Sequence, residues 1–302
     1  MPTSLHIRPT TKVALITGAA GILGPEICLK LRREGWHVAA TDRLAADFDI
    51  AESILGEKKF WDFRWLGDLS SKSACGDCVH ATEEVLGPIS LLVNNAAYSY
   101  REKTLWELEE ARAVELFQIN TLAPLWLAAA ALPSLTLNRG TVINISSAQT
   151  QGWLANNHLY IASKAALEKL TETLSADFAD IGARCIGLRL GSFPGVRFLR
   201  DYLQQLPEEA IGSMVAEILP LHLERTADLL GENCVGSAAE LAEFLLLLTS
   251  PHARMLNGCI LSVDGGMTVR PIAWPSQTES YQQARQWFEN WKQQHHNASD
   301  KN

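Results

Sequence analysis

Residues 13–26 read VALITGAAGILGPE, and this stretch decides the fold class of the chain. Its first five residues are mostly apolar, as expected of a strand buried on both faces of a parallel sheet. Gly18, Gly21 and Gly24 follow at intervals of three, and Pro25 begins a segment with helical periodicity. This order of strand, glycine-rich turn and helix predicts that the turn and the helix N-terminus hold the phosphates of a dinucleotide.

The same alternation of apolar runs and helix-patterned segments continues along the chain. The predicted strands are Val13–Thr17, His37–Thr41, Trp61–Leu66, Leu91–Asn94, Gly140–Ser146, Arg184–Leu190 and Ile260–Val263. The predicted helices are Pro25–Glu34, Lys72–Leu86, Leu105–Ala131, Tyr160–Ala179 and Ala238–Thr249. The pattern indicates an α/β protein with a doubly wound, Rossmann-like parallel sheet that carries helices on both faces.

Three segments lie outside this alternation, so we expect one Rossmann-like domain over residues 12–270 with two appendages. Residues 1–11 are predicted to be a flexible N-terminus. Residues 192–235, between the sixth strand and the last helix, are predicted to form a helical lid over the substrate. Residues 271–302 are predicted to be a C-terminal helical extension with an aromatic packing stripe.

Composition limits the classes of partner. The formal net charge is −8 and the basic residues are scattered, which argues against nucleic acid. The most apolar segment, Thr121–Leu137, is interrupted by prolines and falls short of a bilayer span, so we interpret it as a core helix and expect no membrane contact. No signal-like segment begins the chain, and we expect a cytoplasmic protein.

Cys75 and Cys78 form a single CxxC, which favours ordinary thiols over a redox or metal site, and no metal is predicted.

The second strand ends at Asp42, 18 residues after Gly24. A carboxylate at this place accepts hydrogen bonds from the ribose hydroxyls of NAD and repels the 2′-phosphate of NADP, so NAD is preferred. Arg43 keeps NADP open, because a guanidinium holds a 2′-phosphate well. Further contacts are predicted where the turn and the other strands end. They are Ile22 and Leu23 in the turn, Asp68 and Leu69 after the third strand, and Asn95, Ala96 and Ala97 after the fourth.

Tyr160 and Lys164 lie four positions apart and share one face of a predicted helix. A nearby ammonium favours the phenolate and lowers the pKa of a tyrosine, which suits it to acid and base catalysis. Ser147 ends the fifth strand, 13 residues before Tyr160, where its hydroxyl can hold a substrate oxygen; Ser146 is the competing candidate. Asn120, on the preceding helix, is suited to carry a water toward Lys164.

These motifs together resemble the short-chain dehydrogenase/reductase family over roughly residues 12–268. The motifs that carry the resemblance are TGAAGILG, Asp42, Asp68, NNAA at 94–97, Asn120, Ser147, YIASK at 160–164 and VDGG at 263–266. The resemblance implies hydride transfer to or from a nicotinamide and a catalytic tetrad of Asn120, Ser147, Tyr160 and Lys164. In this tetrad Tyr160 exchanges the proton, Lys164 lowers its pKa and binds the ribose, and Asn120 supports a relay water. A homodimer or homotetramer is also implied.

Two departures from the family pattern keep alternatives open. The spacing TGxxGxxG is typical of larger sugar-nucleotide epimerases and dehydratases, whereas the compact members have TGxxxGxG. Ile186 and Leu190 replace the usual Asn and Pro of the sixth strand, although Gly191 and Phe193 can still complete the nicotinamide side. The alternatives are therefore an NAD-retaining epimerase or dehydratase and a non-enzymatic nucleotide-sensing scaffold.

The leading interpretation is an NAD(P)-dependent oxidoreductase that interconverts a secondary alcohol and a ketone. The residues predicted to face the substrate are Gln149, Trp153, His158 and Arg197. Their amide, imidazole and guanidinium groups favour a small polar substrate such as a sugar or a hydroxy acid.

Overall fold

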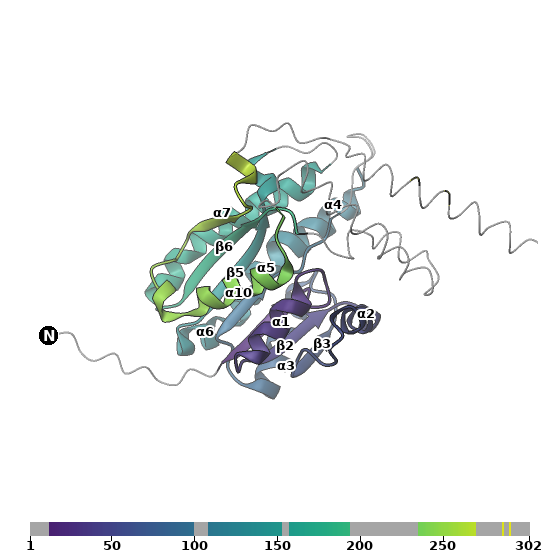
Figure 1. The fold of residues 1–302 in the computed structure, drawn as a ribbon. Helices are drawn as coiled ribbons and strands as arrows, with labels where there is room; N and C mark the ends of the chain where they lie inside the picture. The colour runs from purple at the N-terminus through teal and green to yellow at the C-terminus, as the bar shows by residue number, and fades with distance from the viewer. Residues whose placement is uncertain are drawn as a thin grey trace, which may run out of the picture.

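The protein is described by a computed structural model that covers residues 12–99, 108–152, 157–193 and 235–269, together with Gln286 and Asn290. Its centre is a parallel sheet of seven strands in the order β3-β2-β1-β4-β5-β6-β7 (Figure 1). The strands are β1 (Val13–Thr17), β2 (His37–Asp42), β3 (Phe63–Leu66), β4 (Leu91–Asn94), β5 (Thr141–Ser147), β6 (Arg184–Leu190) and β7 (Ile260–Val263).

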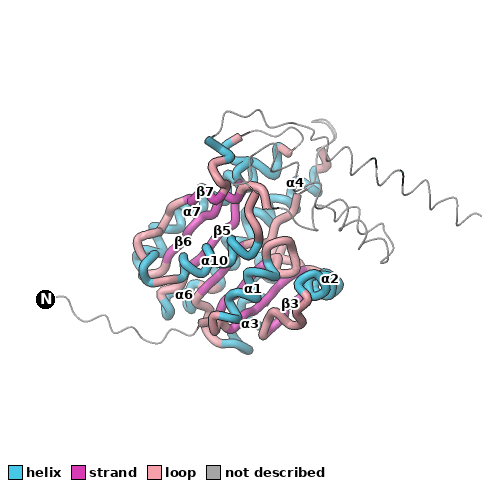
Figure 2. Tube along the Cα trace, viewed as in Figure 1, coloured by secondary structure: helices cyan, strands magenta, loops and turns pink. Residues whose placement is uncertain are grey.

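Helices cover both faces of this sheet (Figure 2). The helices α1 (Gly24–Arg33), α2 (Ala45–Leu55) and α10 (Ala238–Thr249) enclose one core, in which Ile16, Val93 and Ile143 are buried. The opposite core lies under α3 (Lys72–Leu86), α5 (Ala123–Ala130) and α7 (His158–Asp180), with Leu15 and Leu92 at its centre. Apolar side chains thus leave each strand in both directions, which confirms the predicted doubly wound sheet.

Shorter elements complete the described chain. They are α4 (Glu110–Phe117), the π-helix η2 (Gln118–Leu122), α6 (Leu132–Asn138), and the 3-10 helices η3 (Ala148–Gln151), η6 (Pro251–Ala253) and η7 (Met267–Val269). The predicted helix Leu105–Ala131 therefore consists of α4, η2 and α5, and its first three residues lie outside the described chain. The helix α2 was not predicted, since it lacks a side-chain cap and buries little beyond Phe48 and Ala51.

The apolar run Glu110–Ala130 is long and apolar enough to cross a membrane when judged by length and composition, a test that core helices of soluble proteins also pass. Leu116, Ile119 and Leu127 of this run are buried in the protein, in agreement with the interpretation of a core helix. Of the predicted lid, Ser192, Phe193 and Val235 are described, and Ser192 forms an isolated parallel bridge with Val235. The rest of the lid lies outside the described residues, as does the C-terminal extension apart from Gln286 and Asn290.

Cys75 and Cys78 lie buried on α3 as free thiols. Burial raises the pKa of each thiol to about 12, so both stay protonated near neutral pH. This environment agrees with the interpretation of CxxC as ordinary helix residues.

Candidate active site

Strand order reverses between β1 and β4, and the loops that leave these two strands meet at the carboxyl edge of the sheet. The hydroxyl of Thr17 accepts hydrogen bonds from the N–H groups of Asn95, at 3.0 Å, and Ala96, at 2.9 Å. The Asn95 amide donates in turn to the carbonyl oxygens of Thr17 and Gly18, at 2.9 and 3.0 Å. The loop after β4 is therefore fixed to the first half of the glycine turn.

The glycine turn leaves no room for side chains at two positions. A Cβ on Gly18, where φ is +61°, would lie 2.8 Å from the Cα of Ala96, and a Cβ on Gly24 would lie 2.5 Å from the Cα of Ala19. The turn leads into the N-terminus of α1, where Leu23 provides no side-chain cap. Uncapped N–H groups at a helix N-terminus suit a pyrophosphate, and Gly21, Ile22 and Leu23, the residues predicted to contact the phosphates, lie in this turn just before or at the start of α1.

Asp42 lies beside this turn at the end of β2. Its carboxylate accepts hydrogen bonds from the N–H groups of Ala20, at 3.1 Å, and Arg43, at 2.8 Å. The Arg43 guanidinium points to other acids: its Nη1 lies 3.2 Å from Glu115 Oε1 and 3.6 Å from Asp68 Oδ2. Asp68 therefore faces Arg43, and its neighbour Leu69 is buried in the core. Three carboxylates and one already paired guanidinium surround the place predicted for the adenosine ribose.

Ser147, Tyr160 and Lys164 lie together farther along the same edge. Ser147 is the last residue of β5, its hydroxyl accepts a hydrogen bond from the N–H of Gln149 at 3.2 Å, and it lies close enough to Tyr160 to lower the pKa of that phenol. Lys164 is 2% exposed, and its Nζ lies 5.9 Å from the centre of the Tyr160 ring and donates to the Ile145 carbonyl at 2.8 Å. The three side chains form one group, as the helical spacing predicts.

The two serines of this strand differ in their surroundings. The hydroxyl of Ser146 is buried and donates to Glu168 Oε1 at 2.6 Å, on the side of the strand that faces the interior. Ser147 is half-buried and lies close enough to Tyr160 to lower the pKa of the phenol. The geometry therefore favours Ser147 over Ser146 as the residue that holds a substrate oxygen.

Burial has opposite effects on the two titratable groups. It lowers the pKa of Lys164 to about 8, although the negative charge of Glu168 acts in the other direction. It raises the pKa of Tyr160 above its ordinary value, while the hydrogen bond with Ser147 lowers it. The net shift of the Tyr160 pKa is therefore upward, because burial of the phenolate outweighs the hydrogen bond with Ser147, and the lowering of this pKa by Lys164 stays a prediction.

Asn120 lies in the π-helix η2, a local widening of the helix that often marks a functional site. Its side-chain N–H₂ donates to the Tyr98 carbonyl at 2.8 Å and to the Ser163 hydroxyl at 3.0 Å, and its Oδ1 accepts from the Tyr98 N–H at 2.7 Å. Both amide protons are thus used inside the protein. The side chain joins the loop after β4 to α7, and the relay water that the resemblance implied stays a prediction.

On the nicotinamide side, Gly191 follows β6 and donates its N–H to the Val263 carbonyl at 3.0 Å. A Cβ on Gly191 would lie 2.7 Å from the Cα of Asp264, and the ring of Phe193 lies against Gly236. Gly191 and Phe193 therefore lie at the same sheet edge as the other predicted cofactor residues. Ile186 and Leu190, which replace the family's usual Asn and Pro, are buried in the core.

Of the predicted substrate residues, Gln149 and His158 belong to the described chain, and Trp153 and Arg197 lie outside it. Gln149 Oε1 accepts a 2.6 Å hydrogen bond from the Nδ2 of Asn157, a buried residue that sequence reasoning missed. His158 is exposed at the start of α7. The structure therefore brings Gln149 into contact with the residues around Ser147.

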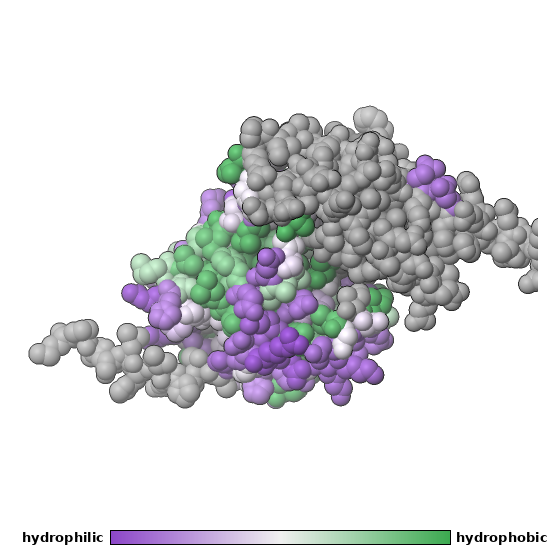
Figure 3. Space-filling model, viewed as in Figure 1, coloured by the Kyte–Doolittle hydropathy of each residue, from purple (hydrophilic) through white to green (hydrophobic). Residues whose placement is uncertain are grey.

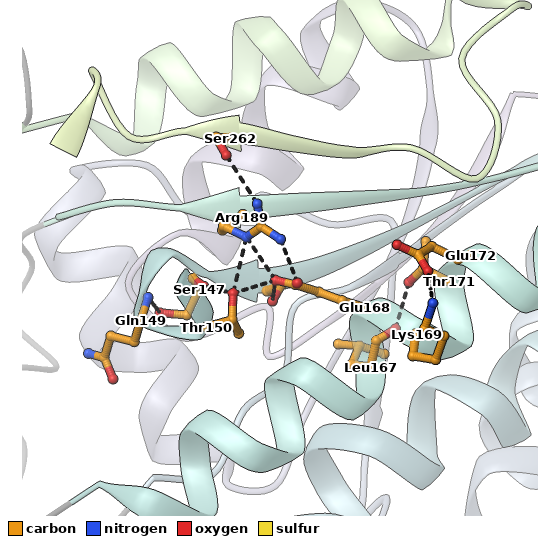
Figure 4. A network of polar contacts seen from close by, with 11 residues as sticks. Ser147, Gln149, Thr150, Leu167, Glu168, Lys169, Thr171, Glu172, Arg189 and Ser262 are labelled. Atoms are coloured by element: carbon orange, nitrogen blue, oxygen red, sulfur yellow. Dashed lines mark hydrogen bonds and ion pairs between the residues drawn. The ribbon is translucent and has the colours of Figure 1, made fainter. Parts of the chain in front are cut away.

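Two further charged residues near the site were not predicted. Glu168 and Arg189 form an ion pair in which Nη2 and Oε2 are 2.6 Å apart, with side chains 10% and 14% exposed (Figure 4). The available signal was the position of Glu168 four residues after Lys164 on one helix face. An arginine near the end of a mainly apolar strand, flanked by Leu188 and Leu190, was a second signal.

Comparisons with known proteins place the chain in a family. The family described as short chain dehydrogenase matches residues 12–197. The chain is 29% identical to a galactitol 2-dehydrogenase (L-tagatose-forming) of Cereibacter sphaeroides, with 85% of this chain and 94% of that protein covered. It is 28% identical to a gluconate 5-dehydrogenase of Gluconobacter oxydans, with the same two shares covered.

A solved structure has a similar fold. The crystal structure of L-sorbose reductase from Gluconobacter frateurii, complexed with NADPH and L-sorbose, superposes with a TM-score of 0.71 at 23% identity and covers 87% of this chain and 99% of its own. The glycine turn, the carboxyl-edge site and the family match lead to one conclusion. The chain belongs to the short-chain dehydrogenase family and is an NAD(P)-dependent oxidoreductase that acts on CH–OH groups.

Proposed function

We propose that the protein interconverts a secondary alcohol and a ketone on a small polyhydroxylated substrate, with Tyr160 as the acid and base. The observation that carries this proposal is the grouping of Ser147, Tyr160 and Lys164 at the sheet edge that also holds the glycine turn. A hydroxyl, a phenol and an ammonium at these places are the groups that an alcohol oxidation needs for its proton.

Each residue has a separate task in this scheme. Ser147 donates a hydrogen bond to the substrate oxygen and holds it near the phenol of Tyr160. Tyr160 takes the alcohol proton during oxidation and returns it during reduction. Lys164 stabilises the phenolate through its ammonium group, which offsets the cost of burial. Asn120 keeps α7 in place through Ser163. The bound nicotinamide supplies the chemistry of hydride acceptance and donation.

A polyol or sugar acid is the substrate class that we propose. The relatives named above include enzymes of galactitol and gluconate. The described residues around Ser147 also offer amides, with Gln149 and Asn157 hydrogen-bonded to each other at 2.6 Å. Such groups lose hydrogen bonds when an apolar substrate binds, and they therefore favour hydroxyl-rich molecules.

A panel of substrates tests this class. Purified protein is assayed for nicotinamide reduction with hexitols, aldonic acids, simple hydroxy acids and hydroxysteroids. We expect turnover with at least one hexitol or aldonic acid at a kcat/KM well above that for any steroid. Turnover restricted to hydroxysteroids would refute the proposed class while leaving the chemistry intact.

NAD is the cofactor that we propose as preferred, with NADP as the weaker ligand. Asp42 faces the glycine turn, and Arg43 is already paired with Glu115 and Asp68. A 2′-phosphate placed here would meet three carboxylates, whereas ribose hydroxyls can donate to Asp42. Dissociation constants of NAD and NADP measured by calorimetry decide the matter: we expect NAD to bind more tightly, and tighter NADP binding would contradict the proposal.

A homodimer or homotetramer in the cytoplasm is the state that we propose. Family members commonly form oligomers. In this chain β7 is an edge strand, and Leu247 of the adjacent α10 is 59% exposed. An edge strand beside exposed apolar side chains is a surface suited to a second copy of the chain.

A further inference from the structure

A polar network, buried around its central carboxylate and exposed at Ser262, lies next to Ser147 and joins five elements of the fold (Figure 4). Its centre is the carboxylate of Glu168 on α7. Glu168 Oε1 accepts from the Ser146 hydroxyl at 2.6 Å and lies 2.8 Å from the Thr150 hydroxyl. Arg189, on β6, donates to both carboxylate oxygens, from Nε at 3.1 Å and from Nη2 at 2.6 Å. Arg189 Nη1 reaches the Ser262 hydroxyl of β7 at 3.4 Å.

The network holds the chain on both sides of Ser147. Ser146 precedes it on β5, and Thr150 follows it in η3. The Thr150 hydroxyl also lies 2.9 Å from the carbonyl oxygen of Ser147 itself and accepts from Arg189 Nε at 3.0 Å. Contacts before, at and after Ser147 therefore converge on one carboxylate, which limits the movement of the strand end that carries the hydroxyl.

The same carboxylate belongs to α7, the helix that also carries Tyr160 and Lys164. Glu168 lies one helical turn after Lys164 on α7, and two turns after Tyr160. Because Glu168 is charged and nearly buried, its position is stable only while Arg189 and the hydroxyls of Ser146 and Thr150 donate hydrogen bonds to its carboxylate. Glu168 thus links the helix of Tyr160 and Lys164 to the strand and turn of Ser147.

We propose that Glu168 is a positioning residue of the reaction, which, through Ser146, Thr150 and Arg189, fixes the distance between the Ser147 hydroxyl and the Tyr160 phenol. The proposal rests on the function proposed above, since it concerns the same two groups. Small displacements of reacting groups lower rates strongly, by up to about 100-fold for roughly 1 Å. Loss of the network should therefore lower kcat while the cofactor, bound at the glycine turn, keeps its affinity.

The first test changes the carboxylate and uses a control on the same helix. In Glu168→Gln the shape is kept and one oxygen can still accept, but the charge is lost and an N–H₂ donor faces the Nη2 of Arg189 in place of Oε2, so the ion pair that anchors the network is broken. We expect kcat to fall about 10- to 100-fold, with the dissociation constant of NAD unchanged within about threefold. Glu172→Gln is the matched control, because it removes the same charge one turn later from a surface pair with Lys169, and it should keep the wild-type kcat. Wild-type kcat in Glu168→Gln would overturn the proposal.

The second test separates positioning from stability. Glu168→Met/Arg189→Met removes both buried charges at once, so the melting temperature should recover relative to either single methionine variant. We expect kcat to stay low in this double variant, because no acceptor remains for Ser146 and Thr150. Recovery of kcat together with the melting temperature would show a merely structural ion pair and would overturn the proposal.

The third test decides the matter if the charge variants do not fold. Thr150→Val keeps the shape of the side chain and removes its hydroxyl, and Thr150→Ser restores the hydroxyl. We expect kcat to fall about tenfold in Thr150→Val and to return to near the wild-type value in Thr150→Ser. Equal kcat values in Thr150→Val and wild type, or equally low values in both variants, would refute the role of the network.

The experiments distinguish an error in the positioning role of Glu168 from an error in the proposed function. If Tyr160→Phe turns over like the wild type, the proposed proton chemistry is wrong and the network has no reaction to support. If Tyr160→Phe is inactive but the Glu168 and Thr150 variants are fully active, the function stands and the positioning role falls.

Discussion

Lys164 keeps an ammonium group at a place where the side chain is 2% exposed, and its Nζ donates to the backbone carbonyl of Ile145. The unfavourable desolvation is the reason that the pKa falls to about 8. Tyr160, its neighbour, is held protonated by the same burial. Burial therefore shifts the protonation equilibrium of each side chain toward its neutral form. Because the two side chains are close together, the ammonium and the phenolate can stabilise each other during turnover.

The lowered pKa of Lys164 predicts a dependence of stability on pH. Between the folded pKa of about 8 and the ordinary value of 10.5, the unfolded state holds a proton that the folded state has released, so the contribution of Lys164 to stability rises with pH. From about pH 7 to about pH 9.5 the free energy of unfolding of the wild type should gain about 2 kcal/mol relative to that of Lys164→Met. Urea denaturation of both proteins at the two pH values measures it; parallel pH dependences would argue against a buried charge at this position.

Arg43 is a second residue whose partners decide its role. In the structure its guanidinium is 3.2 Å from Glu115, a residue of α4 far away in sequence. We predict that Glu115→Gln lets Arg43 turn to a 2′-phosphate and tightens NADP binding about three- to tenfold, with little effect on NAD. Glu110→Gln on the same helix is the control for the loss of one negative charge. Calorimetric dissociation constants that change equally for both cofactors would contradict this account.

At the scale of elements, the sequence pattern was sufficient to predict β1, the glycine turn and α1, because the motif lies within a single continuous segment. Asn120 shows the limit of this reasoning. Its role depends on a π-turn and on partners 22 and 43 residues away, Tyr98 and Ser163, which periodicity does not reveal. The helix α2 was missed for a related reason, since its apolar face is small and its start has no capping side chain.

Replacing glycine by alanine should have opposite effects on stability at Gly24, at the end of the glycine turn, and at Gly76, inside α3. In Gly24→Ala the new Cβ meets backbone atoms at 2.5 Å, so we expect a loss of about 1–3 kcal/mol of stability and weaker NAD binding. In Gly76→Ala, inside α3, the new Cβ has no atom within 4 Å, and stability should rise by about 0.5–1 kcal/mol through the loss of glycine flexibility. Chemical denaturation of both variants measures these changes. A Gly24→Ala protein as stable as wild type would rule out the tight contact between the turn and Ala19.

For the whole molecule, two cores share one parallel sheet, and the alternation of strands and helices was enough to predict this layered architecture. The positions of charged residues in the interior were not predicted. Arg189 interrupts an apolar strand, and its partner Glu168 comes from a helix 21 residues earlier. Such pairs depend on the register between elements, which the sequence of either element does not contain.

The distribution of hydrophobic residues on the surface predicts that the protein forms oligomers. In the view of Figure 3, hydrophobic residues gather around α10 and hydrophilic ones around α1 and α2. We expect light scattering to give a mass that is a multiple of one chain, and Leu247→Glu to shift the protein toward smaller assemblies. Val85→Glu, which changes a side chain 58% exposed on α3, should leave the mass unchanged. A wild-type mass of one chain at all concentrations would contradict the proposed oligomer.

The central claim is that the phenol of Tyr160 transfers the substrate proton. It is tested most directly by Tyr160→Phe, which keeps the ring and removes the hydroxyl. With a substrate identified from the panel, kcat should fall at least about 100-fold, while calorimetry finds NAD bound with nearly the wild-type dissociation constant. Near-normal kcat in Tyr160→Phe, with NAD binding intact, would contradict the claim.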